Sequence, residues 1–233
     1  MKKLYFIAPF IIQLFVRFTF KHLSRYFLHS RVTGLENLKN VKGPILLASN
    51  HLHEFDPLII PSVIPQKIFK SPLFFVALER KYYIQSDQPV GWRSRFYGML
   101  FFKTLGAYPI KKGVKDYEIS LSRHLSILTD GGSVYIFPEG KRTSTGKIQQ
   151  GHGGLGYLAY HSGATIIPVA IDGIWQMNLK SFLTGKNTLS VNIGKPIYPN
   201  ELFPKGIMGD VKIYKSITEK TMTSITNMLT PYQ

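Results

Sequence analysis

Apolar residues along the chain fall into short uninterrupted runs and into longer segments with helical spacing. The short runs are bounded by Gly, Pro or polar residues and predict strands at 43–50, 72–78, 107–110, 133–137, 165–171 and 189–198. Helical spacing or helix-start signals predict helices after Pro57, within 91–106, and at 115–129, 153–161 and 210–229. Strands that alternate with helices indicate an α/β fold, in which helices flank one mostly buried central sheet.

The first thirty residues show a different pattern. The apolar run from Leu4 to Val16 is shorter than the roughly 20 residues that a membrane span needs. Polar residues recur at every fourth position and form one stripe on a helix: Gln13, Arg17, Lys21 and Arg25. We predict a membrane-associating helix over 1–30, lying in the interface with its basic side chains on anionic headgroups, and one domain over 31–233. An ordinary helix packed on the domain is the alternative.

The chain carries a large excess of positive charge, with 29 Lys and Arg against 13 Asp and Glu and a net charge of +16. This balance indicates an anionic partner, such as a phospholipid, a phosphorylated substrate, an acidic carrier protein or nucleic acid. No nucleic-acid recognition signature is present, so no nucleic-acid partner is expected. The absence of Cys excludes disulfides and thiolate chemistry.

The stretch SNHLHEFDPL, residues 49–58, places two histidines and two carboxylates within six positions. His51-x-His53 begins like the H-x-H-x-D-H ligand motif of the metallo-β-lactamase fold, but Phe55 and Asp56 do not continue it. A catalytic zinc site needs three protein ligands, and the other histidines form no comparable cluster. The sequence therefore predicts no metal site.

A general base needs fewer partners than a metal site. The strand is expected to end near Asn50, and a helix to begin at Pro57 with Asp56 as its N-cap. His51 and Asp56 then lie on either side of one tight turn. Their contact would fix the imidazole tautomer and leave the other ring nitrogen to accept a proton. A histidine that only satisfies a strand-to-helix turn is the alternative.

A second polar group follows the strand that begins at Ser133. Glu139 and Gly140 come directly after this strand, and Arg142 offers a planar fork that suits a phosphate. Ligands of α/β sheets bind where several strands end on one side, so the two groups are expected to share a site.

The letters GHGGLG at 151–156 satisfy a dinucleotide fingerprint, but no strand precedes them, and we interpret them as the entry to a helix.

The segments NHLHEFD (50–56) and FPEGKR (137–142) resemble the N-H-x₄-D and F-P-E-G-T-R-S signatures of the PlsC-like glycerolipid acyltransferases, the lysophosphatidic acid acyltransferase family. Two further blocks, GAYPIKK (106–112) and IIPVAI (166–171), follow in the expected order. The resemblance covers about residues 43–171. Lysines replace the usual Thr of the third block and the usual Arg of the second, which affects the acceptor headgroup more than the chemistry.

The resemblance implies transfer of a fatty acyl group from a thioester to a hydroxyl of lysophosphatidic acid in phospholipid biosynthesis. It makes His51 the general base and Asp56 the carboxylate that orients it. It assigns acceptor binding to Lys111, Lys112, Glu139, Gly140 and Arg142.

The resemblance also implies no resident cofactor, because the donor, acyl-CoA or an acyl-carrier protein, is a co-substrate. The other expected partners are the lysophospholipid acceptor and anionic membrane lipids, with a peripheral location on the cytoplasmic face of the cell membrane. Two alternatives stay open. One is the same chemistry on glycerol 3-phosphate, another lysophospholipid or an aminolipid, and the other is a non-enzymatic basic protein that binds membranes or nucleic acid.

Overall fold

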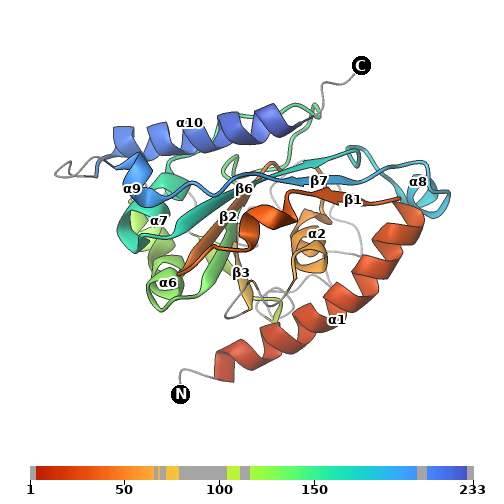
Figure 1. Cartoon of the computed structure of the whole chain (residues 1–233), viewed down its shortest axis with the longest axis horizontal. Coiled ribbons are helices and arrows are strands. Elements are labelled where there is room, and N and C mark those ends of the chain that lie inside the picture. The colour runs from red at the N-terminus through yellow and green to blue at the C-terminus, as the bar shows by residue number, and fades with distance from the viewer. Residues whose placement is uncertain are drawn as a thin grey trace.

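The computed structural model describes residues 4–65, 68, 72–78, 104–110, 116–203 and 209–229. Its centre is a seven-stranded sheet in the order β1-β7-β6-β2-β5-β3-β4 (Figure 1). The strands are β1 (Arg31–Thr33), β2 (Ile45–Ser49), β3 (Leu73–Leu78), β4 (Ala107–Ile110), β5 (Ser133–Ile136), β6 (Thr165–Asp172) and β7 (Ser190–Ile193). Neighbouring strands of this sheet run parallel, except that β7 runs antiparallel to β6.

Helices cover both faces of the sheet. They are α1 (Leu4–Phe27), α2 (Asp56–Val63), α6 (Tyr117–Thr129), α7 (Gly154–Ser162), α8 (Leu179–Leu183), α9 (Pro199–Leu202) and α10 (Val211–Met228), with a 3₁₀ turn at Leu35–Leu38. Alternate residues of β2 point to opposite faces, so Leu47 packs beneath α1 and α2 whereas Leu46 packs beneath α6, α7 and α10. Every residue of β2 is therefore buried. The predicted α/β fold with a mostly buried central sheet is confirmed.

Most predicted elements are present with small shifts at their ends. β4 spans the four residues predicted for it, and α6 begins at Tyr117 behind the N-cap Asp116, whose carboxylate accepts the Glu118 N–H. The pattern does not predict β1, α8 or α9, because β1 contains no apolar run and the helices α8 and α9 are too short to repeat a helical period. The helix predicted within 91–106 lies almost entirely outside the described residues.

The start of α2 corrects the sequence prediction by one residue. Asp56 is the first residue of the helix rather than its N-cap, which is Phe55. The Asp56 carboxylate makes no capping bond to α2 and is instead fully buried against the preceding turn.

A glycine allows α7 and α10 to cross closely. A Cβ atom on Gly156 would lie 2.1 Å from the carbonyl oxygen of Tyr214, so no other residue fits at this crossing. α7 follows a loop and starts after Gly153. The interpretation of GHGGLG as the entry to a helix is confirmed, and the last glycine also provides the crossing point.

α1 turns part of its polar stripe toward the domain, which corrects the predicted orientation. The Gln13 side chain is only 3% exposed, and its amide group both donates to and accepts from the backbone of Leu73. Arg17 donates to the carbonyl oxygen of Ile64, and burial lowers the pKa of its guanidinium group. These two side chains satisfy backbone groups of the domain and so do not face a membrane surface.

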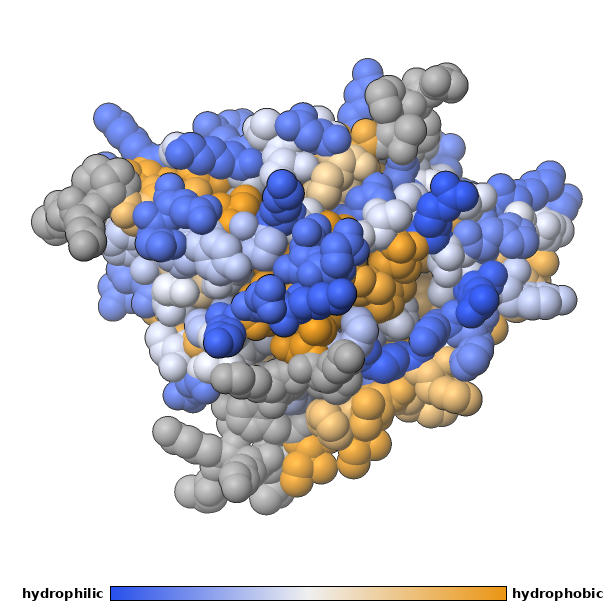
Figure 2. Space-filling view, viewed as in Figure 1, coloured by the Kyte–Doolittle hydropathy of each residue, from blue (hydrophilic) through white to orange (hydrophobic). Residues whose placement is uncertain are grey.

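The outward face of α1 is apolar. Large side chains along it are exposed: Ile7, Phe10, Ile11, Leu14, Phe15, Phe18, Leu23 and Tyr26. Figure 2 shows the resulting apolar band along α1. Lys21 and Arg25, the other half of the predicted stripe, are exposed. Among the described residues, no helix is long and apolar enough to cross a bilayer.

Candidate active site

Two turns meet at the carboxyl ends of β2 and β5. These strands are parallel neighbours with Ala48 opposite Ile136, so the chain leaves both at the same edge of the sheet. We refer to residues 50–56 as the β2 turn and to residues 137–143 as the β5 turn. Below them, the Ser49 hydroxyl and the buried Tyr135 hydroxyl lie 2.6 Å apart.

The β2 turn brings His51 against Asp56. The Nδ1 atom of His51 lies 2.8 Å from the Oδ2 atom of Asp56. The same oxygen accepts the backbone N–H groups of Leu52 at 2.7 Å and His53 at 2.9 Å. The backbone of the β2 turn therefore holds the Asp56 carboxylate in place independently of its contact with the imidazole.

This geometry determines which ring nitrogen of His51 can accept a proton. An aspartate carboxylate only accepts hydrogen bonds, so the Nδ1 atom carries the hydrogen and the Nε2 atom keeps its lone pair. The side chain of His51 is 17% exposed whereas that of Asp56 is fully buried. The face of the ring stacks on Phe137, with 3.9 Å between ring centroids and 13° between planes.

Glu139 in the β5 turn faces inward. Its Oε1 atom accepts the His51 N–H at 2.8 Å, and its Oε2 atom accepts the Gln149 N–H at 2.8 Å. Only 2% of the residue is exposed. Burial raises the pKa of the carboxyl group, and the two backbone hydrogen bonds oppose this shift. The predicted role of Glu139 in direct acceptor binding does not fit this placement, because the carboxylate is occupied inside the fold.

The rest of the β5 turn contains two exposed residues followed by a buried one. Gly140 has a φ of 68°, the left-handed region that glycine tolerates without strain. Lys141 and Arg142 follow and are exposed. Thr143 is buried, and its N–H donates to the carbonyl oxygen of His51 at 2.9 Å. The β5 turn thus bonds both the N–H and the C=O of His51.

The structure brings together five of the seven predicted site residues: His51, Asp56, Glu139, Gly140 and Arg142. The other two, Lys111 and Lys112, lie outside the described residues. Two residues without a predicted role also contribute. Phe137 stacks on the His51 ring, and Asn50 donates to and accepts from the backbone of Ile171 at the end of β6. Both residues belong to the two motifs recognised in the sequence, but the sequence alone did not indicate what they contact.

His53 has partners of its own. Its Nε2 atom lies 3.1 Å from the carbonyl oxygen of Met177, and its Nδ1 atom accepts the Phe55 N–H at 3.3 Å. Within the described residues, no group of three or more His, Cys, Asp or Glu side chains could hold a metal ion.

Comparison with known proteins adds a family match. The sequence model of a family described as Acyltransferase matches residues 29–172. Two chloroplastic 1-acyl-sn-glycerol-3-phosphate acyltransferases also align. That of Arabidopsis thaliana is 26% identical over 178 residues, and that of Brassica napus 24% over 177 residues. Both alignments cover 74% of this chain but only 44% and 46% of the relatives, so the chain spans less than half of their length.

A solved structure shares the fold. The 1-acyl-sn-glycerophosphate (LPA) acyltransferase PlsC from Thermotoga maritima superposes with a TM-score of 0.60 at 19% sequence identity. The match covers 97% of this chain and 83% of that chain. The resemblance therefore extends well beyond the two turns, through the described helices and strands.

Proposed function

Because the chain belongs to the PlsC-like acyltransferase family, we propose that it transfers a fatty acyl group from a thioester to a hydroxyl of lysophosphatidic acid. The observation that carries the proposal is the His51–Asp56 pair, 2.8 Å apart at the edge where β2 and β5 end. The named relatives, which act on 1-acylglycerol 3-phosphate, support this choice of acceptor.

In the proposed reaction, His51 acts as a general base. Its Nε2 atom takes the proton of the acceptor hydroxyl while the hydroxyl oxygen attacks the thioester carbonyl carbon. The C–S bond then breaks, and the imidazolium returns the proton to the departing thiolate. The carboxylate of Asp56 holds the ring in the required tautomer and stabilises the imidazolium. The enzyme needs no nucleophile of its own, in keeping with a chain that contains no Cys.

The acceptor phosphate is assigned to the exposed part of the β5 turn. Arg142 can form a forked pair with a phosphate, and the bend at Gly140 brings the backbone close to it. Lys111 and Lys112 complete the proposed set from the sequence. Glu139 is assigned a positioning role, because it holds the backbone of His51.

The donor is proposed to be acyl-CoA or an acyl-carrier protein, with no resident cofactor. The excess of positive charge, +16 over the chain, suits the phosphates of the first and the acidic surface of the second. The donor's own thioester supplies the activated acyl group, so the chain has only to bind it and position its carbonyl.

The proposed location is the membrane surface, on the cytoplasmic face. Eight large apolar side chains line the outward face of α1, whereas Gln13 and Arg17 turn inward. A helix that buries polar groups against the domain and exposes apolar ones suits a lipid environment. The basic residues at its end, Lys21 and Arg25, would meet anionic headgroups.

One experiment tests the reaction, donor and acceptor together. The purified chain is incubated with labelled acyl-CoA or acyl-carrier protein and with lysophosphatidic acid, lysophosphatidylethanolamine or glycerol 3-phosphate. The expected result is a diacylated phosphatidic acid, detected by mass spectrometry, that the His51→Ala variant does not form. Product from another acceptor alone would overturn the assigned acceptor. No product from any pair would overturn the proposed reaction.

A further inference from the structure

The short helix α8 presents two leucines to the outside. Leu179 is 66% exposed and Leu183 is 54% exposed, and the spacing of four positions places them on one side of the helix. The helix is closed by a capping box, in which the side chains of Asn178 and Ser181 each bond the backbone of the other residue. The two leucines are therefore displayed on a fixed helix and not on an irregular loop.

α8 lies beside the C-terminal end of α1 (Figure 1). The rings of Phe27 and Phe182 are 5.1 Å apart. The residue just before β7 is bonded to the same region, because the Leu189 N–H donates to the Leu28 carbonyl oxygen at 2.8 Å. α8 therefore packs against the end of α1, although the two helices are far apart in the sequence.

The two segments that form this region contain basic residues but no acidic ones. No Asp or Glu occurs before Glu36 or between Asp172 and Glu201. Within these segments Lys180, Lys186 and Arg25 are exposed. Exposed leucines among exposed basic side chains match an anionic lipid surface, which offers apolar chains and negative headgroups together.

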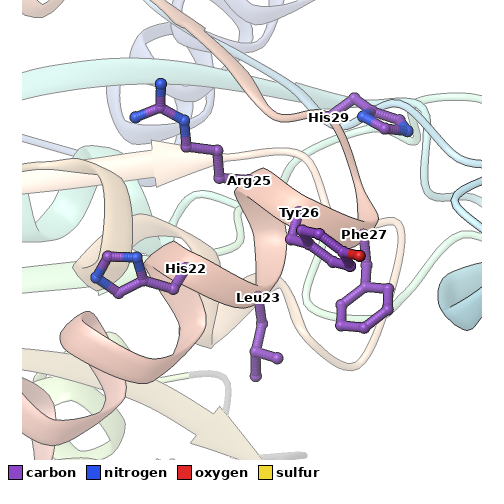
Figure 3. Close-up of a pocket in the computed structure, with 6 residues that line it drawn as sticks. All are labelled: His22, Leu23, Arg25, Tyr26, Phe27 and His29. Atoms are coloured by element: carbon purple, nitrogen blue, oxygen red, sulfur yellow. The ribbon is translucent and has the colours of Figure 1, made fainter.

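The end of α1 also borders an open hollow lined by His22, Leu23, Arg25, Tyr26, Phe27 and His29. Figure 3 shows these side chains spreading outward in different directions from the last turns of the helix and from the chain just after it. They do not converge on a common point, so the hollow does not define a site for one bound molecule. Aromatic and basic side chains spread along an edge are typical of contact with a membrane interface.

We propose that α8 and the last turn of α1 form a second membrane contact, specific for bilayers with anionic lipids. The inference rests on the proposed membrane association through α1. Contact along α1 alone leaves the domain free to rotate about the axis of that helix. A second contact at Leu179 and Leu183 removes this rotation and fixes how the edge with His51 is presented to the bilayer.

The test is flotation with vesicles of equal parts phosphatidylglycerol and phosphatidylcholine. The double variant Leu179→Asp/Leu183→Asp should lower the fraction bound by about tenfold, because two apolar side chains no longer enter the interface. The matched control is Ile119→Asp, which replaces an equally exposed apolar residue, 58% exposed, on α6 at the other side of the molecule. This control should float like the wild type. Lys180→Glu/Lys186→Glu should weaken binding to these vesicles but not to pure phosphatidylcholine.

Two results with the leucine variant would overturn the inference. One is unchanged flotation of the leucine variant. The other is a wild-type dimer in light scattering that the leucine variant alone abolishes, because the face would then join two copies of the chain. Circular dichroism checks folding, and the milder Leu179→Gln/Leu183→Gln variant should show the same direction of change.

Activity is measured separately with a short-chain soluble acceptor in detergent. The leucine variants should keep wild-type activity there, because the contact serves only the bilayer. A wild type that turns over this acceptor but fails to float would overturn the membrane contacts and leave the proposed reaction intact. A wild type that floats but converts no acceptor would overturn the proposed reaction and leave the membrane contacts intact.

Discussion

The β2 turn and the β5 turn each bury one carboxylate, and they use it differently. Asp56 accepts the N–H groups of its own turn and the ring of His51. Glu139 accepts the backbone N–H of His51 in the neighbouring turn and that of Gln149. Asp56 fixes the tautomer of the His51 imidazole, and Glu139 fixes the backbone of His51.

The comparison shows that a buried acid next to a histidine need not act on its imidazole. Removing Asp56 should change the chemistry of His51 directly, whereas removing Glu139 should act mainly on the position of His51. Substitutions in the two turns should therefore differ in size and in kind.

The largest effect is expected from His51→Ala, which removes the proposed base. General base assistance is worth about 10²–10⁴ in rate, so kcat should fall by about that factor. The measurement is product formation from saturating donor and acceptor, with circular dichroism to check the fold. A kcat within about threefold of the wild type would rule out this role for the imidazole.

Asp56→Asn should have the second largest effect, a fall in kcat of about 10²-fold. An amide in this position can present an N–H group to the Nδ1 atom, which favours the wrong tautomer of His51. The KM for the acceptor should change much less than kcat, because Asp56 is fully buried and does not contact the acceptor. An equal change in both constants would indicate that the turn itself has collapsed.

Glu139→Gln should lower kcat by about tenfold, because one backbone N–H then faces an amide N–H and the backbone of His51 shifts. The tautomer of His51 should be unaffected. The pH dependence of kcat should therefore keep its shape, whereas Asp56→Asn should alter it. A pH profile changed by Glu139→Gln as much as by Asp56→Asn would remove the distinction between the two carboxylates.

The variant Glu139→Gln should also change how the stability of the fold depends on pH. Burial raises the pKa of Glu139, so the folded chain binds more protons than the unfolded chain in the window above the ordinary value of 4.5. The stability contributed by Glu139 is therefore lost as the pH rises through this window. Urea unfolding at several pH values should show a steeper loss in the wild type than in Glu139→Gln. A steeper loss in the variant would contradict the burial of the charge.

Arg142→Ala should act on binding and not on the chemical step. Loss of a charge-assisted bond to phosphate should raise the KM for lysophosphatidic acid by about tenfold, with a smaller change in kcat. Arg142→Lys should restore part of the affinity. The matched control is Lys147→Ala, which removes another exposed cation close by in the sequence and should leave the KM near that of the wild type. Equal effects of Arg142→Ala and Lys147→Ala would indicate a general charge effect.

The features that the sequence predicted correctly are local ones. The apolar run of β2 and the helical spacing of α6 depend on residues a few positions apart, and both are confirmed. The family resemblance depends on short blocks that follow in order over residues 43–171, and it is also confirmed. The contact between His51 and Asp56 is of the same kind, because five residues of turn limit where the carboxylate can go. Its catalytic role stays a prediction until the variants are measured.

The features that the sequence missed depend on distant packing. Glu139 stands close to Lys141 and Arg142 in the sequence, a composition typical of a solvated turn. Its inward orientation follows only from the hydrogen bond with His51, which comes from a distant part of the chain. Asn50 bonds to Ile171, 121 positions away. The stripe on α1 predicted a two-sided helix correctly, but periodicity does not indicate which side meets the domain. Gln13 faces inward because backbone groups of Leu73 need partners there.

The smallest effect is expected from His53→Ala, although His53 stands two positions from the proposed base. Its Nε2–H donates to the carbonyl of Met177, and its Nδ1 accepts the N–H of Phe55. Both ring nitrogens are thus engaged within the protein, and neither offers a lone pair to a substrate or metal. The variant should keep kcat within about threefold of the wild type, and a chelator should affect neither protein. Equal losses from His53→Ala and His51→Ala, together with inhibition by the chelator, would instead favour a metal held by both rings and break the division of roles between the two turns.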